Sequence, residues 1–196
     1  MNVFVGFEPE LLAMIPQPVK AIIFLYPITE GYKDFKQQEE DHLKAHGQMI
    51  SPKVAFFKQT ISNACGMMAL LHTLTNNQDI VGPGLFRQIM EDTRHMTSDA
   101  RVNYLERCQA LANVHAASAQ EGQTQPPNLD EQLTDHFICF VEIDQHLYEL
   151  DGIKSFPINH GKCVDLIQGA AKIMKQFIQR EPGLNNFSAI ALSKVQ

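Results

Sequence analysis

The sequence predicts a single α+β domain in which helices surround a largely antiparallel sheet. Short apolar, β-branched runs of strand length alternate with segments whose apolar residues recur every three or four positions, as on one face of a helix. The 196 residues are enough for one well-filled core and few for two, and neither an internal repeat nor a linker divides the chain. We therefore expect one domain over residues 1–196.

The first third of the chain is expected to contain a short helix and a buried strand. Pro9 in a first turn indicates a helix over residues 8–15. The apolar run 19–26 is followed by a proline and is typical of a buried strand. The polar stretch 32–46 predicts an exposed helix or loop, and residues 54–58 predict a further strand.

An apolar helix is predicted from Asn63 onward. It is apolar on most sides, as a buried helix is, and Ser62 or Asn63 is placed to cap its N-terminus. Two more helical patterns follow, over residues 85–90 and 99–111. Residues 114–130 are mostly small and polar and predict a long loop, and connections of this length often act as lids or binding loops.

The last third alternates strands and one helix. Residues 136–143 are apolar on both faces, as in a central strand, and a tight turn leads into a second strand over 147–151. Apolar residues at spacings of three and four mark an amphipathic helix over 164–178. Residues 187–192 predict the final strand.

Composition argues against several classes of function. The net charge is −6 and no Lys/Arg cluster suggests a phosphate-binding surface, so we expect no nucleic-acid partner. No apolar run is long enough to cross a bilayer, and no signal-peptide pattern is present, so no membrane association is expected. The four cysteines fit neither a zinc ribbon nor a small disulfide framework. We expect free thiols in a reducing compartment, the cytoplasm or also the nucleus.

Cys65 is the candidate nucleophile. A cysteine attacks as its thiolate, which a helix N-terminus or a neighbouring imidazolium favours. Cys65 stands at the expected start of the buried helix, beside Gly66, which lets a substrate carbonyl approach the backbone. Its own N–H is free of helix hydrogen bonds and can face an oxyanion. By the local sequence alone, a structural cysteine is the favoured interpretation and a catalytic one the alternative.

His136 and Asp151 are candidates for a base and its orienting carboxylate. Pairing across the hairpin places residue 151 opposite residue 139, one pleat from His136. Asp151 can then hold one imidazole nitrogen while the other faces Cys65. Gln59 can supply an amide donor to an oxyanion. A histidine at a strand edge and an Asp-Gly turn also have structural explanations, so spacing alone does not decide.

An eight-residue segment around Cys65 resembles the active-site signature of the ubiquitin C-terminal hydrolases, the UCH family (peptidase family C12) of deubiquitinating cysteine peptidases. The segment reads Gln59-Thr60-Ile61-Ser62-Asn63-Ala64-Cys65-Gly66. Further segments resemble the family in the same order along the chain: Pro9–Leu12, His136–Ile138, His146–Gly152, Phe156–Gly161 and Phe187–Leu192. The resemblance covers essentially the whole chain and is closest to the short single-domain members.

The resemblance implies a papain-like cysteine peptidase core that removes small or unfolded adducts from the C-terminal glycine of ubiquitin. It implies Cys65 as nucleophile, His136 as general base and acid, Asp151 as the residue that orients His136, and Gln59 as the oxyanion-hole side chain. The loop at 114–130 corresponds to the family's crossover loop, which arches over the active site. Ubiquitin is the implied partner of a monomeric enzyme, and neither a cofactor nor a metal is required.

Two alternatives stay open at this point. Family members of this type usually carry a further N-terminal segment that contributes to the cleft for the ubiquitin tail, and the resemblance here starts after that segment. The chain could therefore be a ubiquitin-binding module with little or no catalysis. The same chemistry could also act on a ubiquitin-like modifier such as NEDD8.

Overall fold

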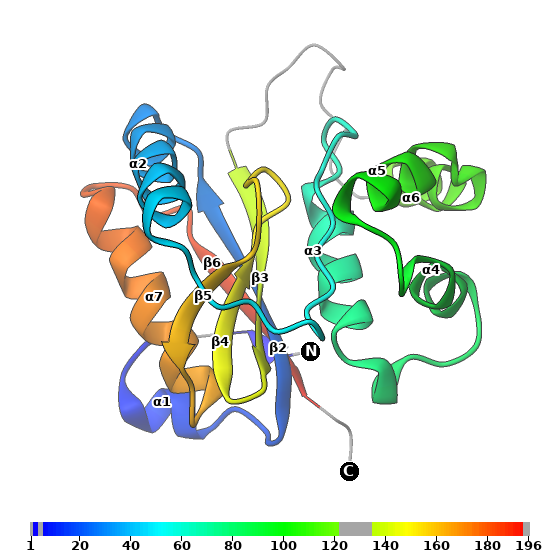
Figure 1. Cartoon of the computed structure of the whole chain (residues 1–196). Coiled ribbons are helices and arrows are strands. Elements are labelled where there is room, and N and C mark those ends of the chain that lie inside the picture. Colours follow the sequence, from blue (N-terminus) through cyan, green and yellow to red (C-terminus); the bar gives the residue numbers. More distant parts are fainter. Residues whose placement is uncertain (1, 4–5, 122–134, 194–196) are drawn as a thin grey trace.

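The computed structural model describes residues 2–3, 6–121 and 135–193, and its core is one antiparallel sheet (Figure 1). Six strands follow the order β1-β6-β2-β3-β4-β5. Strands β2 and β3 are the longest and lie side by side in the middle. The strands are β1 (Asn2–Val3), β2 (Val19–Pro27), β3 (Asp135–Ile143), β4 (His146–Leu150), β5 (Ile158–Lys162) and β6 (Ser188–Ser193).

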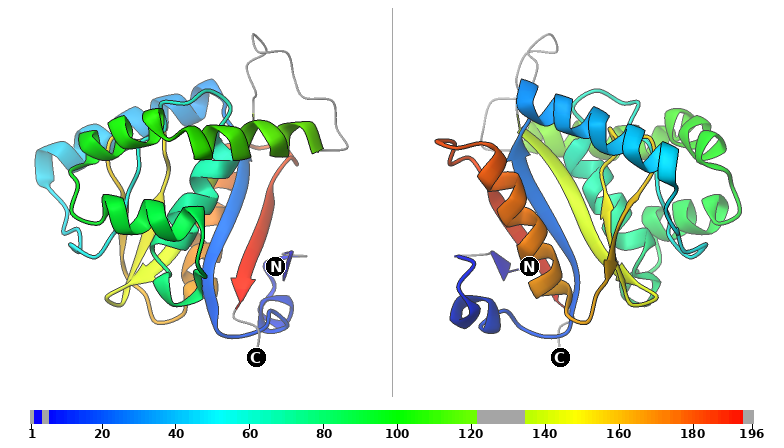
Figure 2. Two further views of the ribbon diagram at one scale, coloured as in Figure 1. Left: turned by 90° about the vertical axis from the view of Figure 1, so that its right-hand side faces the viewer. Right: turned by 60° about the vertical axis from the view of Figure 1, so that its left-hand side comes forward.

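Helices cover both faces of the sheet (Figure 2). One face carries α1 (Pro9–Ala13), α2 (Glu30–His46) and α7 (Leu166–Arg180). The other carries α3 (Cys65–Thr75), a 3₁₀ turn (Gln78–Ile80), α4 (Leu85–Thr93), α5 (Ser98–Arg107) and α6 (Gln109–Glu121). None of the helices within the described ranges is both long and apolar enough to cross a membrane.

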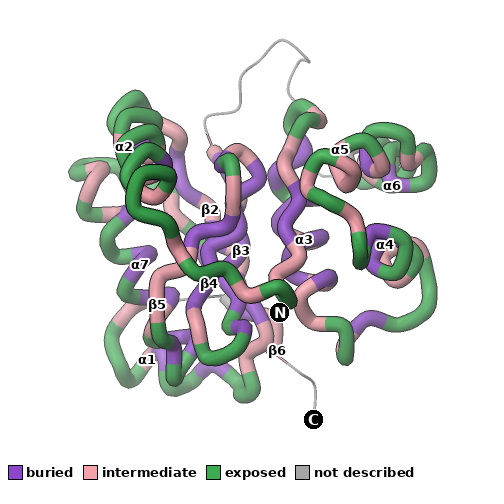
Figure 3. The backbone as a smooth tube through the Cα atoms, viewed as in Figure 1, coloured by how far each residue is buried: buried purple, intermediate pink, exposed green. Residues whose placement is uncertain are grey.

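The apolar alternation of β2 and β3 buries both faces of the sheet. Phe24 and Phe140 pack toward α7, whereas Cys139 points the other way and contacts Thr73 of α3 through its sulfur, 3.2 Å from the threonine oxygen. A separate apolar cluster joins α3 to α4, α5 and α6. Figure 3 shows the buried backbone running through the central strands and α3. Helix α3 is therefore fixed between the sheet and the outer helices, and its first residue is fixed with it.

Strands β3 and β4 form a two-residue hairpin. Asp144 and Gln145 both have positive φ, 50° and 62°, as a type I′ turn requires. The turn pairs Ile143 with His146 and Cys139 with Leu150. The predicted register, with residue 151 opposite residue 139, is therefore wrong by one residue.

Residues 54–58 do not form the predicted strand. The side chains of His72 in α3 and of Asn76, the C-cap of that helix, satisfy their backbone groups instead of a neighbouring strand. The Asn76 amide accepts from the Ala55 N–H and donates to its carbonyl, both at 2.8 Å. The His72 Nε2 lies 3.0 Å from the Phe57 nitrogen. This extended segment leads directly to Gln59 and is anchored to the same helix that carries Cys65.

The helical patterns between residues 98 and 121 also differ from the prediction. The pattern over 99–111 is divided between α5 and α6, because the chain leaves helical geometry at Cys108 (ψ 84°). The loop predicted from residue 114 is wrong up to Glu121, since α6 continues to that residue. Alanine is the best helix former, and no Gly or Pro interrupts the sequence before Gly122. The rest of the predicted loop, 122–130, lies outside the described residues.

Strand β5 was absent from the sequence prediction. Its residues, Ile158–Lys162, include Asn and Gly, which are depleted in strands and common in turns. It pairs with β4 at the edge of the sheet, where His146 faces Lys162 and Tyr148 faces Asn159. His160 therefore belongs to an edge strand and not to a turn.

Candidate active site

Cys65 is the first residue of α3, and only 8% of it is exposed. The chain enters the helix through Asn63, whose φ of 55° asparagine tolerates better than most residues. Ala64 occupies the N-cap, so the predicted capping by Ser62 or Asn63 is wrong. An alanine side chain cannot accept a hydrogen bond. The N–H groups of the first turn therefore stay available to a ligand or to the Cys65 sulfur.

His136 and Asp151 lie beside Cys65, at the end of the sheet where β2 finishes and β3 begins. The His136 Nε2 is 2.7 Å from Oδ1 of Asp151, and both side chains are buried. The one-residue change in register leaves this contact intact because Asp151 directly follows β4. With Nε2 engaged by the carboxylate, the other ring nitrogen is left for Cys65. The structure thus brings these three predicted site residues together.

Asp151 has further partners that the sequence did not indicate. The hydroxyls of Tyr26 and Tyr32 donate to its Oδ2 at 3.1 and 2.7 Å. The Ile153 N–H donates to Oδ1 at 3.0 Å. A fully buried carboxylate needs such donors to remain ionised.

The electrostatics favour a thiolate beside an imidazolium. Burial raises the pKa of Cys65, but hydrogen bonding to His136, the Phe137 and Gly66 N–H groups and the imidazolium charge outweigh it and lower that pKa. Burial lowers the pKa of His136, yet its hydrogen bonds to Asp151 and Cys65 raise it to about 9. The pKa of Asp151 lies well below its usual range despite burial, because His136 donates to it. At neutral pH both shifts favour a deprotonated Cys65 and a protonated His136.

Gln59 reaches the site from the extended segment before α3. Its N–H donates to the Gly152 carbonyl at 2.8 Å, which ties it to the residue after Asp151. Its buried Oε1 accepts no hydrogen bond from any described residue. A Cβ added to Gly152 would lie 2.9 Å from the Gln59 Cβ, closer than real contacts allow. Glycine at position 152 therefore permits the approach of the Gln59 side chain.

Comparison with known proteins identifies the family to which the chain belongs. The family model described as "Ubiquitin carboxyl-terminal hydrolase, family 1" matches residues 2–179. Ubiquitin carboxyl-terminal hydrolase isozyme L1 of Macaca fascicularis and of Homo sapiens is 41% identical over 194 residues, covering 96% of this chain and 85% of each relative. The chain belongs to ubiquitin carboxyl-terminal hydrolase family 1. The predicted enzyme class, a thiol protease of the ubiquitin pathway (EC 3.4.19.12), is confirmed.

Solved structures confirm the predicted fold of this family 1 hydrolase. The catalytic domain of Trichinella spiralis UCH37, bound to ubiquitin vinyl methyl ester, is similar with a TM-score of 0.73 and 22% identity, covering 100% of this chain and 84% of that chain. A second UCH37 structure has a TM-score of 0.67 and 20% identity, covering 97% and 70%. The sequence segments also suggested isozyme L3 as the nearest type. Both relatives with 41% identity are isozyme L1, so the comparisons support the family and not the L3 type.

The other cysteines of the hydrolase lack the surroundings of Cys65. Burial raises the pKa of Cys139 to about 12, and burial with nearby carboxylates raises that of Cys163. Cys108 is half-buried, and all four thiols are free. Across the residues that the structure describes, no group of three or more His, Cys, Asp or Glu side chains could hold a metal ion.

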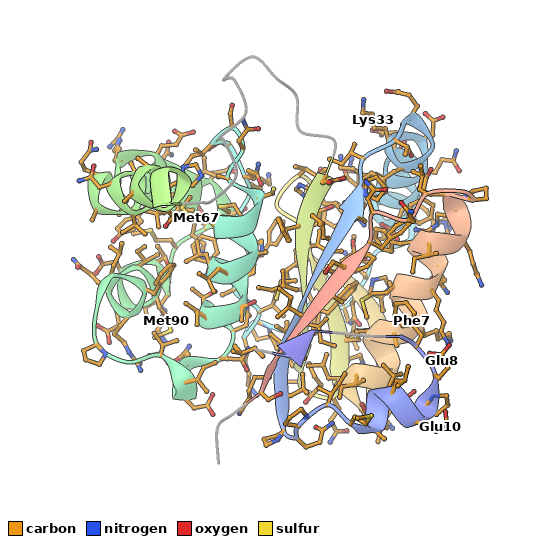
Figure 4. The ribbon with its side chains drawn as sticks, turned by 180° about the vertical axis from the view of Figure 1, so that it is seen from behind. Phe7, Glu8, Glu10, Lys33, Met67 and Met90 are labelled. Carbon is orange, nitrogen blue, oxygen red and sulfur yellow. The ribbon has the colours of Figure 1, made fainter. Side chains whose placement is uncertain are left out.

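The apolar residues after Cys65 serve the core of the hydrolase. Met68 is buried among Leu71, Ile89 and Leu111. Met67 packs against the same cluster, on the side of α3 that faces the outer helices (Figure 4). These contacts hold the catalytic helix in place.

A buried ionic cluster lies between α2 and β4, close to Asp151. The Lys154 side chain is completely buried and its Nζ lies 2.6 Å from Glu39 of α2 and 2.5 Å from Glu149 of β4. Glu149 also pairs with His160 at 2.9 Å. Burial opposes ionisation of Glu149, but Lys154 and His160 lower its pKa. The cluster joins α2 to the sheet only three residues from Asp151.

Replacement of Lys154 by methionine is expected to destabilise the fold by about 3–5 kcal/mol. The apolar side chain leaves the buried Glu149 without its closest cation. Denaturant unfolding measures the effect. Lys53→Met is the matched control, because the Lys53 pair with Asp144 is exposed to solvent and is expected to contribute little to stability. Equal midpoints for the two variants would show that the buried cluster is not needed for stability.

Sequence reasoning missed Tyr26, Tyr32 and Lys154. All three were included in segments whose periodicity was interpreted as strand, exposed helix or turn. A tyrosine in a strand that is otherwise apolar is a usable signal, because a buried phenolic hydroxyl normally requires a partner. Nothing local in the sequence marks Lys154 as buried.

Proposed function

We propose that Cys65, His136 and Asp151 form a catalytic triad that hydrolyses the bond following the C-terminal glycine of ubiquitin. The observation that carries the proposal is that Asp151 holds one nitrogen of the His136 ring, while the nearby His136 side chain lowers the pKa of the Cys65 thiol. Family membership supports the choice of ubiquitin.

In the acylation step, the Cys65 thiolate attacks the carbonyl carbon of the terminal glycine. The electron pair moves to the carbonyl oxygen, and His136 donates its proton to the leaving amine as the C–N bond breaks. A thioester between ubiquitin and Cys65 results. His136, now neutral, takes a proton from water, and the hydroxide formed attacks the thioester and releases the ubiquitin carboxylate. Asp151 keeps the imidazole oriented and stabilises its charged form throughout.

The oxyanion of each tetrahedral intermediate is assigned to two donors. One is the backbone N–H of Cys65, which belongs to the uncapped first turn of α3. The other is the side-chain amide of Gln59, whose position is supported by the hydrogen bond to Gly152. Donors fixed in advance stabilise developing charge without reorganisation.

The proposed substrates are small or unfolded adducts of ubiquitin. This limit follows from the family's crossover loop, assigned to residues 114–130, beneath which a leaving group must pass. The part of the segment up to Glu121 is helical, because it belongs to α6. We further propose a monomer in the cytoplasm or also in the nucleus, in keeping with four free thiols.

Replacement of Gly152 by alanine is expected to lower kcat about 10²-fold with little change in KM. The added Cβ would push against the Cβ of Gln59 and displace the amide from the oxyanion. Steady-state kinetics on a fluorogenic ubiquitin C-terminal amide measures this. Gly82→Ala is the matched control, since a Cβ at Gly82 meets no atom within 4 Å. An unchanged kcat in a folded Gly152→Ala variant would contradict the assignment of Gln59 to the oxyanion hole.

Covalent capture by ubiquitin vinyl methyl ester tests the proposed function. The wild-type protein is expected to gain the mass of one ubiquitin, and peptide analysis is expected to place the adduct on Cys65. The Cys108→Ala variant should react equally well. An adduct on another cysteine would contradict the assignment of the nucleophile. Calorimetric binding of ubiquitin without capture would support the alternative in which the chain is a ubiquitin-binding module. Faster capture by the corresponding NEDD8 probe would indicate that NEDD8 is the preferred modifier.

A further inference from the structure

We infer that Tyr26 and Tyr32 form a hydroxyl clamp on Oδ2 of Asp151 and act as positioning residues for the triad. The inference rests on the proposed function, because it concerns the same carboxylate. It adds two residues that touch neither the attacking sulfur nor the imidazole proton.

The donors around Asp151 are divided between its two oxygens. Oδ1 receives the His136 ring at 2.7 Å and the Ile153 N–H at 3.0 Å. Oδ2 receives only the two tyrosine hydroxyls, at 2.7 and 3.1 Å, among the hydrogen bonds of the described residues. Rotation of the carboxylate would break both sets at once. The clamp therefore keeps Oδ1 oriented toward His136.

The two hydroxyls come from separate, firmly held elements. Tyr26 is the next-to-last residue of β2 and the strand partner of His136, and the two rings meet edge to face at 5.7 Å between centroids. Tyr32 lies in the first turn of α2, where Thr29 caps the helix by accepting from the Tyr32 N–H at 2.9 Å. The clamp thus fastens the sheet and α2 to one carboxylate.

Packing alone does not account for tyrosine at these positions. Both rings contact Phe177 of α7, with centroids 4.8 Å from Tyr26 and 5.9 Å from Tyr32. Phenylalanine would fill the same space and keep these ring contacts. Each tyrosine is instead almost fully buried with its hydroxyl donating to a charged carboxylate, and a hydrogen bond to a charged acceptor is stronger than one to a neutral acceptor.

The clamp has a consequence for the thiol. Without the hydroxyls, the carboxylate can turn and the imidazole it holds turns with it. The proton on the far side of the ring then no longer points at the Cys65 sulfur. The fraction of Cys65 present as thiolate at neutral pH should fall, and alkylation of that thiol should slow.

The test is the pH dependence of Cys65 alkylation by iodoacetamide in the full chain, followed by mass spectrometry of the peptide that contains Cys65. Tyr26→Phe and Tyr32→Phe are each expected to slow alkylation at pH 7 by about tenfold and to move the midpoint of its pH profile upward. The double variant should lose more than the product of the two single effects, because one remaining hydroxyl still holds Oδ2. The reaction needs no ubiquitin, so failure of the proposed function leaves its result interpretable.

Tyr148→Phe is the matched control. Tyr148 is equally buried, and its hydroxyl accepts from the Ser51 N–H at 3.0 Å, away from Asp151. Its loss should leave the alkylation profile unchanged even if unfolding occurs at lower denaturant. A profile in the double Tyr26→Phe/Tyr32→Phe variant identical to wild type would overturn the inference, and so would a shift equal to that of Tyr148→Phe.

Discussion

Replacement of Cys65 by alanine is expected to reduce turnover of a fluorogenic ubiquitin C-terminal amide by about 10⁶-fold, which is the scale for loss of a nucleophile from a triad. Cys139 and Cys163 are not expected to substitute, because burial raises the pKa of both thiols. Ubiquitin binding should persist, since the change removes one buried sulfur and leaves the surface intact. Steady-state kinetics and calorimetric titration with ubiquitin measure the two quantities.

The control for this variant is Cys163→Ala. This substitution also removes one buried sulfur. In the wild type, however, burial and the nearby carboxylates of Glu142 and Asp165 raise the pKa of the Cys163 thiol. The variant should retain wild-type kcat. Substantial activity in Cys65→Ala would mean that the nucleophile lies elsewhere, whereas loss of ubiquitin binding would mean that the variant reports on folding or recognition.

The predicted triad depended on two kinds of information in the sequence. A chemical signature around Cys65 and the order of His136 and Asp151 along the chain indicated which residues to group. Geometry supported the grouping only loosely, as the hairpin register was wrong by one residue. The predicted contact between His136 and Asp151 is present despite that error, because Asp151 directly follows β4 and its carboxylate extends to the His136 ring. Chemical identity was thus more informative than predicted register.

The residues around the triad were not predictable because their contacts are non-local. Tyr32 reaches Asp151 across 119 positions of sequence, and Lys154 reaches Glu39 across 115. Periodicity describes which side of an element is apolar, and it treats a buried hydroxyl or ammonium as an exposed polar group. Only the docking of α2 on the sheet shows that these side chains are enclosed.

Secondary structure was mispredicted where local propensity and hydrogen bonding outweighed the apparent pattern. Alanines carry α6 through residues 114–121, which a small-and-polar composition suggested as loop. Residues 54–58 resemble a strand but bond to side chains of α3. The first error concerns the C-terminal part of α6, and the second concerns the segment that leads to Gln59.

Replacement of Asp151 by asparagine is expected to lower kcat by about 10³–10⁴-fold, as loss of the corresponding charge does in a serine hydrolase triad. The Asp151 hydrogen bond helps to raise the pKa of His136 to about 9, so its loss should return that pKa toward about 6.5. The imidazolium would then lose its proton near neutrality. The alkaline limit of kcat/KM should therefore move to lower pH, while the pKa of Cys65 moves up. The pH range in which thiolate and imidazolium coexist shrinks from both sides.

The pH profile of kcat/KM measures this change, and Asp144→Asn is its control. Asp144 lies in the exposed hairpin turn, paired with Lys53, and its positive φ suits asparagine. That variant should keep both limits of the wild-type profile. Thermal unfolding separates chemistry from folding, because Asp151 also accepts from both tyrosines. If a folded Asp151→Asn protein kept the alkaline limit near 9, the charge of Asp151 could not be what holds the proton on His136.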